Sequence, residues 1–494
     1  MIKRIIAITA LTTTLIFQSG EISAKLSIPQ IFSDNMVLQC ETEAAIWGWA
    51  SPSGTVTLKG SWMKRPVTVQ AGKDGKWKTT LRTLAPSYSP NTLAICEKGG
   101  DKIVIGNILF GEVWFCSGQS NMEMPMSGFG GCPVEKCNEA IADAGAYPGI
   151  RMVKIPKTGA KTPQDTVAGK WKECNPDNAP DFSATAYFFA IRLNRSLGVP
   201  VGIINCSWGG TPVESWLPER VVADYPDIDF GIVRNLKPDA PWKWHSPSII
   251  FNGMVHPLAG YAIKGFAWYQ GESNVRDSRN YAERLKTMAS IWRSEWGEGD
   301  IPFYIVEIAP YIYPNDKGNV GNEAVGGGIM NALLIEQQHK AASGIPNSGI
   351  ICTNDLVYAS ERLQVHPSRK KDLGDRLAYL ALNKAYGLTG IACEGPSLKK
   401  VEYPGNSTAI LSFDHVEACL KTEGNALEGF EVAGADKLFH PAKAVIGKDN
   451  KSVTVNSENV PEPVAVRYCF RNFLIGNLYN SRDLPAAPFR TDNW

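Results

Sequence analysis

Two kinds of hydrophobic pattern alternate along this chain and divide it into three regions. In the leading region, short runs alternate between apolar and polar residues, which predicts β-strands separated by turns, as at 45–50, 55–58 and 77–81. In the middle region, strand-like runs alternate with amphipathic helical patterns, which is typical of a doubly wound α/β sheet. Strand patterns return in the last region, for example at 408–413 and 464–468. We expect a parallel-sheet α/β domain over 108–388, a β-sandwich over 25–107 and a β-rich region over 389–494.

The middle region contains helix and strand patterns with clear limits. Helices are predicted at 184–197, 281–296 and 373–386, and strands at 113–116, 201–205 and 301–307. Polar segments follow several of these strands. In a doubly wound sheet, ligands bind at the carboxyl ends of the strands, so these polar segments are where chemistry is expected.

The first 24 residues have the order of a secretory signal. Lys3 and Arg4 precede a mostly apolar run at 5–17, and small residues lead to Ala24. We expect cleavage after Ala24 and an exported mature protein, periplasmic or secreted. A membrane anchor is not expected, because the apolar run is shorter than the roughly 20 residues that a span requires.

Composition excludes some classes of function. The 494 residues suggest about three domains, and 44% hydrophobic residues can build sizeable cores. A formal net charge of +1 argues against nucleic acid as a partner, because binding phosphates demands a basic excess. Among the 11 cysteines, Cys132 and Cys137 are the best candidates for a local disulfide. No zinc-ligand spacing accompanies them, so neither a metal nor another cofactor is expected.

Ser120 has the position of a nucleophile. The apolar run 113–116 leads directly into the polar turn Ser117-Gly-Gln-Ser120-Asn. A serine attacks carbonyl groups when it is held at the end of a strand, beside a base and near N–H groups that stabilise negative charge. An ordinary polar turn is the alternative interpretation of the same residues.

Two further turns offer groups for an oxyanion. Gly209 and Gly210 follow the strand 201–205 and allow close approach of backbone N–H groups to a ligand. The segment Trp268-Tyr-Gln-Gly-Glu-Ser-Asn274 contains two side-chain amides, Gln270 and Asn274, either of which could donate to the same oxyanion. A Gly turn and a helix-capping loop are the alternatives.

The general base must be one of the six histidines of the chain. His366 lies in a polar loop just before the predicted helix 373–386, from which it can reach a serine on another loop. A surface histidine is the alternative. His245 is the rival candidate, although its aromatic neighbours suit a substrate wall equally well.

Together these segments resemble the sialate O-acetylesterases, a branch of the SGNH hydrolases and carbohydrate esterases. The resemblance covers nearly the whole mature chain, and its specific motifs are Gly118-Gln-Ser-Asn-Met122 and Gln270-Gly-Glu-Ser-Asn274, followed by His366-Pro367. It implies an SGNH-like α/β fold and a serine esterase that removes acetyl groups from sialic acid, with Ser120 as nucleophile and His366 as base.

The chain departs from this family where the acid of a triad is expected. Many relatives carry an acidic residue just before the His-Pro pair, where this chain has Leu363 and Gln364. Gln364 could orient the imidazole but cannot stabilise imidazolium as a carboxylate does. Asp355 and Glu361 lie on the same approach to the loop, and we favour Asp355.

The sequence leaves the acetylated sugar open. Trp208, Glu272 and Arg276 are the candidate substrate contacts, since an arginine suits the carboxylate of sialic acid and aromatic side chains suit xylan or pectin fragments. The alternatives to a sialate esterase are therefore an acetyl esterase for another glycan, an enzyme of another reaction class, or a non-catalytic carbohydrate-binding protein.

Overall fold

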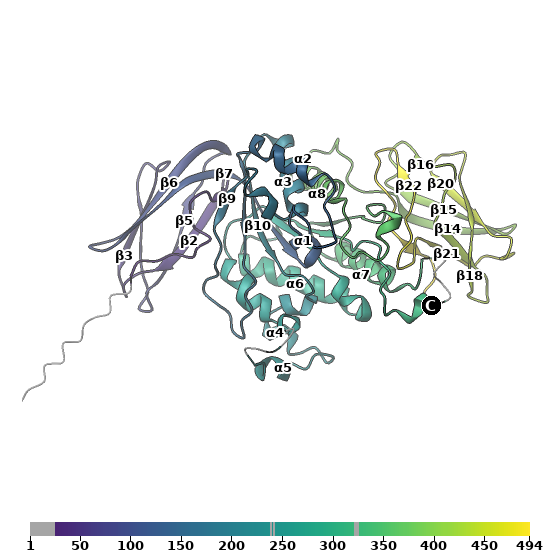
Figure 1. Cartoon of the computed structure of the whole chain (residues 1–494), viewed down its shortest axis with the longest axis horizontal. Helices are drawn as coiled ribbons and strands as arrows, with labels where there is room; N and C mark the ends of the chain where they lie inside the picture. Colours follow the sequence, from purple (N-terminus) through teal and green to yellow (C-terminus); the bar gives the residue numbers. More distant parts are fainter. Residues whose placement is uncertain (1–24, 238–239, 241–242, 321–325) are drawn as a thin grey trace, which may run out of the picture.

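Three regions follow one another along the long axis of the molecule (Figure 1). The structure is a computed structural model that describes residues 25–237, 240, 243–320 and 326–494. The N-terminal strands, in purple, lie at one end, the central sheet with its helices lies in the middle, and the yellow C-terminal strands lie at the other end. The expected signal segment 1–24, with its cleavage point at Ala24, lies outside the described residues.

The central sheet has the strand order β13-β12-β11-β7-β10-β8-β9. Its strands pair in parallel except β8 and β9, which pair antiparallel. The chain crosses to both sides of β7, so the strand order reverses there, which is where open α/β sheets bind ligands. The strands are β7 (Lys102–Gly118), β8 (Ile150–Lys154), β9 (Trp171–Glu173), β10 (Val201–Ser207), β11 (Gly265–Tyr269), β12 (Phe303–Val306) and β13 (Ser348–Ile351).

Strand β7 belongs to two sheets. Its first half pairs antiparallel with β6 (Ser87–Glu97) and in parallel with β1 (Val37–Gln39), and its second half lies between β10 and β11. The expected domain boundary at 107/108 therefore falls inside one continuous strand. The remaining N-terminal strands are β2 (Glu43–Trp49), β3 (Thr55–Gly60), β4 (Val67–Gln70) and β5 (Lys76–Arg82).

Helices cover both faces of the central sheet. Buried side chains of α3 (Ala184–Leu197) and α8 (Lys370–Lys384) pack in one cluster with the sheet, and those of α6 (Tyr281–Trp296) pack in another. The limits of α3 follow from its caps: Ser183 Oγ accepts from the N–H of Ala186, and Gly198 adopts the left-handed conformation with φ +69°. The remaining helices are α1 (Ser120–Glu123), α2 (Cys137–Ala142), α4 (Glu219–Val222), α5 (Gly231–Arg234) and α7 (Met330–Gly344).

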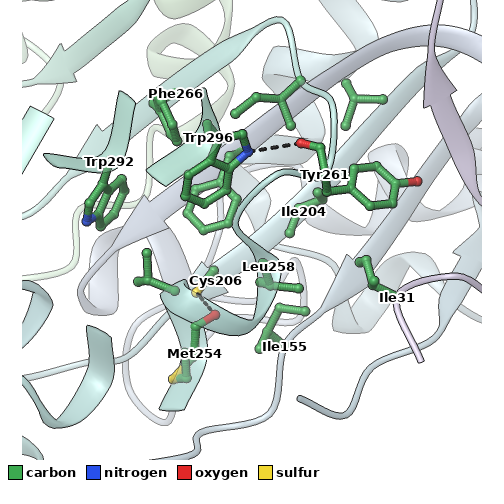
Figure 2. Close-up of a cluster of buried hydrophobic side chains, with 14 of the residues drawn as sticks. Ile31, Ile155, Ile204, Cys206, Met254, Leu258, Tyr261, Phe266, Trp292 and Trp296 are labelled. Atoms are coloured by element: carbon green, nitrogen blue, oxygen red, sulfur yellow. Dashed lines mark hydrogen bonds between the residues drawn. The ribbon is translucent and has the colours of Figure 1, made fainter. Parts of the chain in front are cut away.

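The larger core cluster is rich in aromatic side chains. Figure 2 shows Phe266 of β11 beside Trp292 and Trp296 of α6, with Trp296 donating a hydrogen bond to the carbonyl of Tyr261 at 2.9 Å. Phe266 and Trp296 meet edge to face with ring centroids 5.0 Å apart, a favoured aromatic geometry. Cys206 lies in this core, as expected for a cysteine beside an apolar strand.

The expected disulfide is absent. Cys132 and Cys137 are both free thiols, and so are the other nine cysteines of the chain. The prediction of a Cys132–Cys137 bridge is therefore wrong for this structure. Cys132 lies in a turn held by two backbone hydrogen bonds with Phe129, at 3.0 Å each, and Cys137 is the first residue of α2.

Two four-stranded sheets form most of the C-terminal region, with an apolar cluster of Leu411, Val432, Val453 and Val466 among their buried side chains. The α/β fold flanked by β-rich regions is thereby confirmed. No helix in the described ranges is both long and apolar enough to cross a bilayer. The strands are β14 (Ser397–Gly405), β15 (Thr408–Asp414), β19 (Lys443–Ile446) and β20 (Ser452–Asn456) in one sheet, β17 (Phe430–Ala433), β18 (Phe439–Pro441), β21 (Ala465–Tyr468) and β23 (Phe489–Arg490) in the other, and the separate pair β16 (Leu420–Thr422) and β22 (Leu478–Asn480).

The close packing of α8 on α3 generates a test of the fold. A Cβ atom on Gly374 would lie 2.6 Å from Phe188 Cβ and 2.7 Å from the backbone nitrogen of Phe189. We expect Gly374→Ala to lower the free energy of unfolding by about 1–3 kcal/mol, because this overpacking outweighs the helix propensity that Ala gains. Gly390→Ala is the matched control, since nothing lies within 4 Å of its added Cβ. Equal denaturant midpoints for the two variants would contradict the packing.

Candidate active site

Ser120 lies at the carboxyl edge of the central sheet, directly after β7. Gly118 makes this turn possible: its φ is +139°, and a Cβ there would lie 2.1 Å from the carbonyl oxygen of Tyr269. The N–H of Gln119 then donates to that same carbonyl at 3.0 Å. Ser120 is the first residue of α1 and is partly exposed, as a nucleophile must be.

Two backbone N–H groups beside Ser120 are available to an anion. Gly209 follows β10 and packs so closely that a Cβ on it would lie 3.0 Å from Ser120 Cβ. The N–H of Gly209 donates to Glu123 Oε2 at 2.6 Å. The N–H groups of Ser120 and Gly210 have no acceptor in the described part of the chain. These two groups are therefore free to bind a developing oxyanion.

His366 lies in the loop between β13 and α8 and is partly buried. Its Nε2 atom is buried without a hydrogen-bond partner among the described residues, and its ring meets Phe129 edge to face at 5.1 Å. Burial, with a further contribution from the charge of Lys370, lowers the pKa of His366 to about 4. The imidazole is thus neutral and able to accept a proton. It does not hydrogen-bond Ser120 here, as is common in sites without substrate.

Asn121 connects the serine segment to the histidine loop. Its Nδ2 atom donates to the carbonyl of Val365 at 2.9 Å and to Glu272 Oε1 at 2.5 Å. Its Oδ1 atom accepts from Lys370 Nζ at 2.6 Å. The residue after Ser120 therefore binds the residue before His366, although 244 positions separate them in the chain.

A hydroxyl, an imidazole and free N–H groups thus lie at one sheet edge. This is the set of groups required for acyl transfer through a serine. Within the described ranges, no three His, Cys, Asp or Glu side chains lie together in a way that could hold a metal ion.

Comparison with known proteins identifies the family of the chain. The model of the family described as carbohydrate esterase, sialic acid-specific acetylesterase matches residues 111–383. The chain belongs to this family. It is therefore a carboxylic ester hydrolase, and the predicted resemblance is confirmed.

Individual relatives extend the similarity beyond the matched segment. The sialate O-acetylesterase of Mus musculus is 26% identical and covers 93% of both chains, and that of Pongo abelii is 28% identical over 75% of this chain and 73% of its own. The crystal structure of a carbohydrate acetylesterase from Xanthomonas citri has a TM-score of 0.83 at 34% identity, covering 95% of this chain and 100% of that one.

The carboxylate of Asp355 does not hydrogen-bond the imidazole of His366. Its two carboxylate oxygens accept from the guanidinium of Arg376, at 2.6 Å each, and one of them also accepts from Tyr479 at 3.1 Å. The expectation that Asp355 orients His366 is corrected, because its buried carboxylate neutralises a buried arginine on α8.

Gln364 does not contact the imidazole either. Its Nε2 donates to the backbone carbonyl of His366 at 2.8 Å, which shapes the loop without touching the ring. Glu361, the other acidic residue on this approach, accepts from the backbone N–H groups of Tyr358 and Ser368. No carboxylate in the described residues therefore hydrogen-bonds His366.

The two side-chain amides expected in the oxyanion site, those of Gln270 and Asn274, donate hydrogen bonds to buried protein groups instead. Gln270 Nε2 donates to the carbonyl of Thr211 at 3.0 Å and to Asn274 Oδ1 at 2.8 Å. Asn274 Nδ2 donates to both carboxylate oxygens of Glu214, at 3.3 and 3.1 Å. These bonds leave neither amide pointing at Ser120, so the expectation that one of them completes the oxyanion site is corrected.

The expected substrate contacts lie in three different settings. Trp208 is 9% exposed and stacks on Trp244 with ring centroids 5.9 Å apart. Glu272 has one buried oxygen, Oε2, without a partner among the described residues, and burial raises the pKa of its carboxyl. Arg276 is exposed.

The rival histidine His245 borders the site, since its Nε2 would lie 3.6 Å from a Cβ on Gly210.

Sequence reasoning missed Asn121 and Lys370. Asn121 lies inside the recognised Ser120 motif, but nothing in a motif shows which way an amide points. The sequence gives only a weak indication that Lys370 has a functional role. Lys370 is the first residue of α8, where a positive charge interacts unfavourably with the helix dipole.

Two cavities in the described residues lie away from Ser120. One of about 430 Å³ lies between α7 and the C-terminal strands, lined by His339 and Phe489 among others. Another of about 400 Å³ lies between β2, β5 and the start of the middle region. Ser120 and His366 line neither of them, so the carboxyl edge at Ser120 remains the candidate site.

The contacts of Asp355 lead to a prediction about stability. We expect Asp355→Asn to lower the free energy of unfolding by about 3–5 kcal/mol, because it leaves Arg376 buried without a counter-charge. Ester turnover per folded molecule should change far less than stability. Asp372→Asn is the control, because Asp372 pairs with Arg369 at the surface with 45% of its side chain exposed. If Asp355→Asn is instead stable but has no ester turnover, Asp355 has a catalytic role and not only a structural one.

Proposed function

We propose that this esterase removes O-acetyl groups from sialic acids, with Ser120 as nucleophile and His366 as general base. The observation that carries the proposal is the Asn121 connection, which joins the serine turn to the histidine loop beside two free N–H groups. The mouse and orangutan relatives are both sialate O-acetylesterases, which supports the choice of substrate.

The proposed reaction has two acyl-transfer steps. His366 Nε2 takes the proton from Ser120 Oγ as that oxygen attacks the acetyl carbonyl, and the N–H groups of Ser120 and Gly210 bind the oxyanion. The C–O bond to the sugar then breaks, and the sugar oxygen leaves with the proton from His366. A water molecule, deprotonated by His366, attacks the acetyl-serine, and acetate is released with Ser120 restored.

The proposed site works as a Ser-His dyad. Because Asp355 is bound to Arg376 and Gln364 to a backbone carbonyl, no carboxylate stabilises the imidazolium. The imidazole is positioned instead by its loop, by Phe129 and by the Asn121 bond to Val365. A dyad of this kind has a weaker base than a triad, so tight positioning has to supply more of the rate.

Another acetylated glycan is the second candidate substrate. The exposed Arg276 suits the carboxylate of a sialic acid, whereas the stacked pair Trp208 and Trp244 suits a neutral sugar ring. The similar protein from Xanthomonas citri is a carbohydrate acetylesterase, which also fits the broader choice. Parallel assays with O-acetylated sialic acid and acetylated xylo-oligosaccharides distinguish the two.

We further propose that residues 1–24 direct export and are removed, on the strength of their sequence alone. The domain limits proposed for the mature chain are 25–107, 108–388 and 389–494. The first of these limits divides β7, so the N-terminal and catalytic domains should unfold together rather than independently.

Replacing the proposed nucleophile gives a direct test. Ser120→Ala should reduce kcat for acetyl esters by at least about 10⁴-fold, with an unchanged melting temperature, because it removes the attacking oxygen and little else. Ser127→Ala, an exposed serine on the same segment, is the control and should keep full activity. Undiminished turnover in Ser120→Ala would refute the nucleophile, and a wild-type protein without turnover would favour a carbohydrate-binding protein.

The buried imidazole determines the acid limit of activity. A base has to be neutral, and burial with the charge of Lys370 lowers the pKa of His366 from 6.5 to about 4. We therefore expect kcat/KM to hold as pH falls below 6.5 and to decline only near pH 4. A pH profile of kcat/KM measures this directly. A decline centred at the ordinary histidine value would show that the imidazole is solvated or that another group is the base.

A further inference from the structure

We propose that Lys370 is a positioning residue of this esterase: its buried ammonium fixes the Asn121 amide, which holds the His366 loop against the start of α1. The proposal rests on the proposed function of Ser120 and His366 and adds a residue to it. It is carried by the contacts of three side chains, Lys370, Asn121 and Glu272.

Lys370 supplies the donor for the oxygen of the Asn121 amide. An ammonium group can only donate hydrogen bonds, so the atom of Asn121 that faces it at 2.6 Å must be the oxygen. Both amide hydrogens then point the other way, where Nδ2 meets the Val365 carbonyl at 2.9 Å and Glu272 Oε1 at 2.5 Å. The Val365 carbonyl and the Glu272 carboxylate favour the same orientation, because both only accept, but without Lys370 the buried Oδ1 atom of Asn121 would have no donor.

The burial of Lys370 is costly and argues for a role beyond folding. The residue is 1% exposed, and burial lowers the pKa of its ammonium to about 7. Glu272, Glu361 and Cys132 face it and partly offset this effect, and the ring of Tyr269 lies 5.5 Å from Nζ. An apolar side chain would fill the same space without this desolvation cost.

Lys370 also acts on His366 through its charge. Of the charged groups near the imidazole, Lys370 is the one that lowers the pKa of His366, in addition to burial. The titration of His366 therefore reports whether the ammonium is in place. That measurement does not depend on any substrate.

The experiment compares Lys370→Met, Asn121→Asp and Lys371→Met in the full chain. Lys371→Met is the matched control, because Lys371, next to Lys370 in the chain, has 51% of its side chain exposed and pairs with Asp375. Asn121→Asp keeps an oxygen for Lys370 but has no hydrogen to donate to Val365, so it breaks the connection without removing the lysine. Each variant is assayed for kcat and KM with p-nitrophenyl acetate, for melting temperature, and for His366 titration by NMR.

We expect Lys370→Met and Asn121→Asp to lower kcat by about 10²-fold with little change in KM, as for a displaced catalytic group. Lys370→Met should raise the pKa of His366, and its melting temperature should fall modestly, because the buried Asn121 Oδ1 atom loses its donor. Wild-type kcat in Lys370→Met, or an unchanged His366 titration, would overturn the proposal. If Lys370→Met fails to fold, full activity in Asn121→Asp overturns it alone. If the wild-type protein lacks esterase activity but the His366 titration shifts, the proposed function fails while the placement of Lys370 stands.

Discussion

The site depends on the hydrogen bonds of one buried amide, that of Asn121. A fully buried amide has to satisfy its donors and its acceptor within the protein, because unpaired polar groups in the interior are costly. The partners that satisfy Asn121 come from two other segments: Glu272 follows β11, and Val365 and Lys370 lie in the His366 loop and at the start of α8. Satisfying this amide therefore brings together the turn after β7, the turn after β11 and the loop before α8.

The N-terminal and C-terminal strands both contribute to the position of the groups at the carboxyl edge of the central sheet. Strand β7 begins in the N-terminal sheet and ends at Gly118, so the position of Ser120 is fixed by pairing along its whole length. On the other side, Tyr479 of β22 donates to Asp355, which binds Arg376 of α8. The helix that follows His366 is thus connected to the C-terminal strands through a buried ion pair.

Local patterns were sufficient to predict much of the fold. Helices α3 and α6 have the predicted limits, 184–197 and 281–296, because apolar spacing and a terminal glycine define each of them within the chain. Ser120 and Gly210 were predictable in the same way, since both follow an apolar strand at a turn whose glycines are visible in the sequence.

The side-chain partners could not be predicted from such patterns. Asp355 and Gln364 are near His366 in sequence, but each has a competing partner, a guanidinium on α8 and a backbone carbonyl, that only the fold brings within reach. Gln270 and Asn274 were expected to face the oxyanion, yet they donate inward to Thr211 and Glu214. A sequence shows which polar groups follow a strand and does not show which acceptor each one finds.

The central claim is that Ser120, His366 and two backbone N–H groups form one acyl-transfer site. The most direct measurement is a crystal structure of the chain after reaction with a small fluorophosphonate. We predict a covalent adduct on Ser120 Oγ, with its phosphonyl oxygen about 3 Å from the nitrogens of Ser120 and Gly210 and with His366 Nε2 beside the serine oxygen. An unmodified Ser120, or an adduct whose oxygen meets other donors while His366 stays remote, would contradict the account.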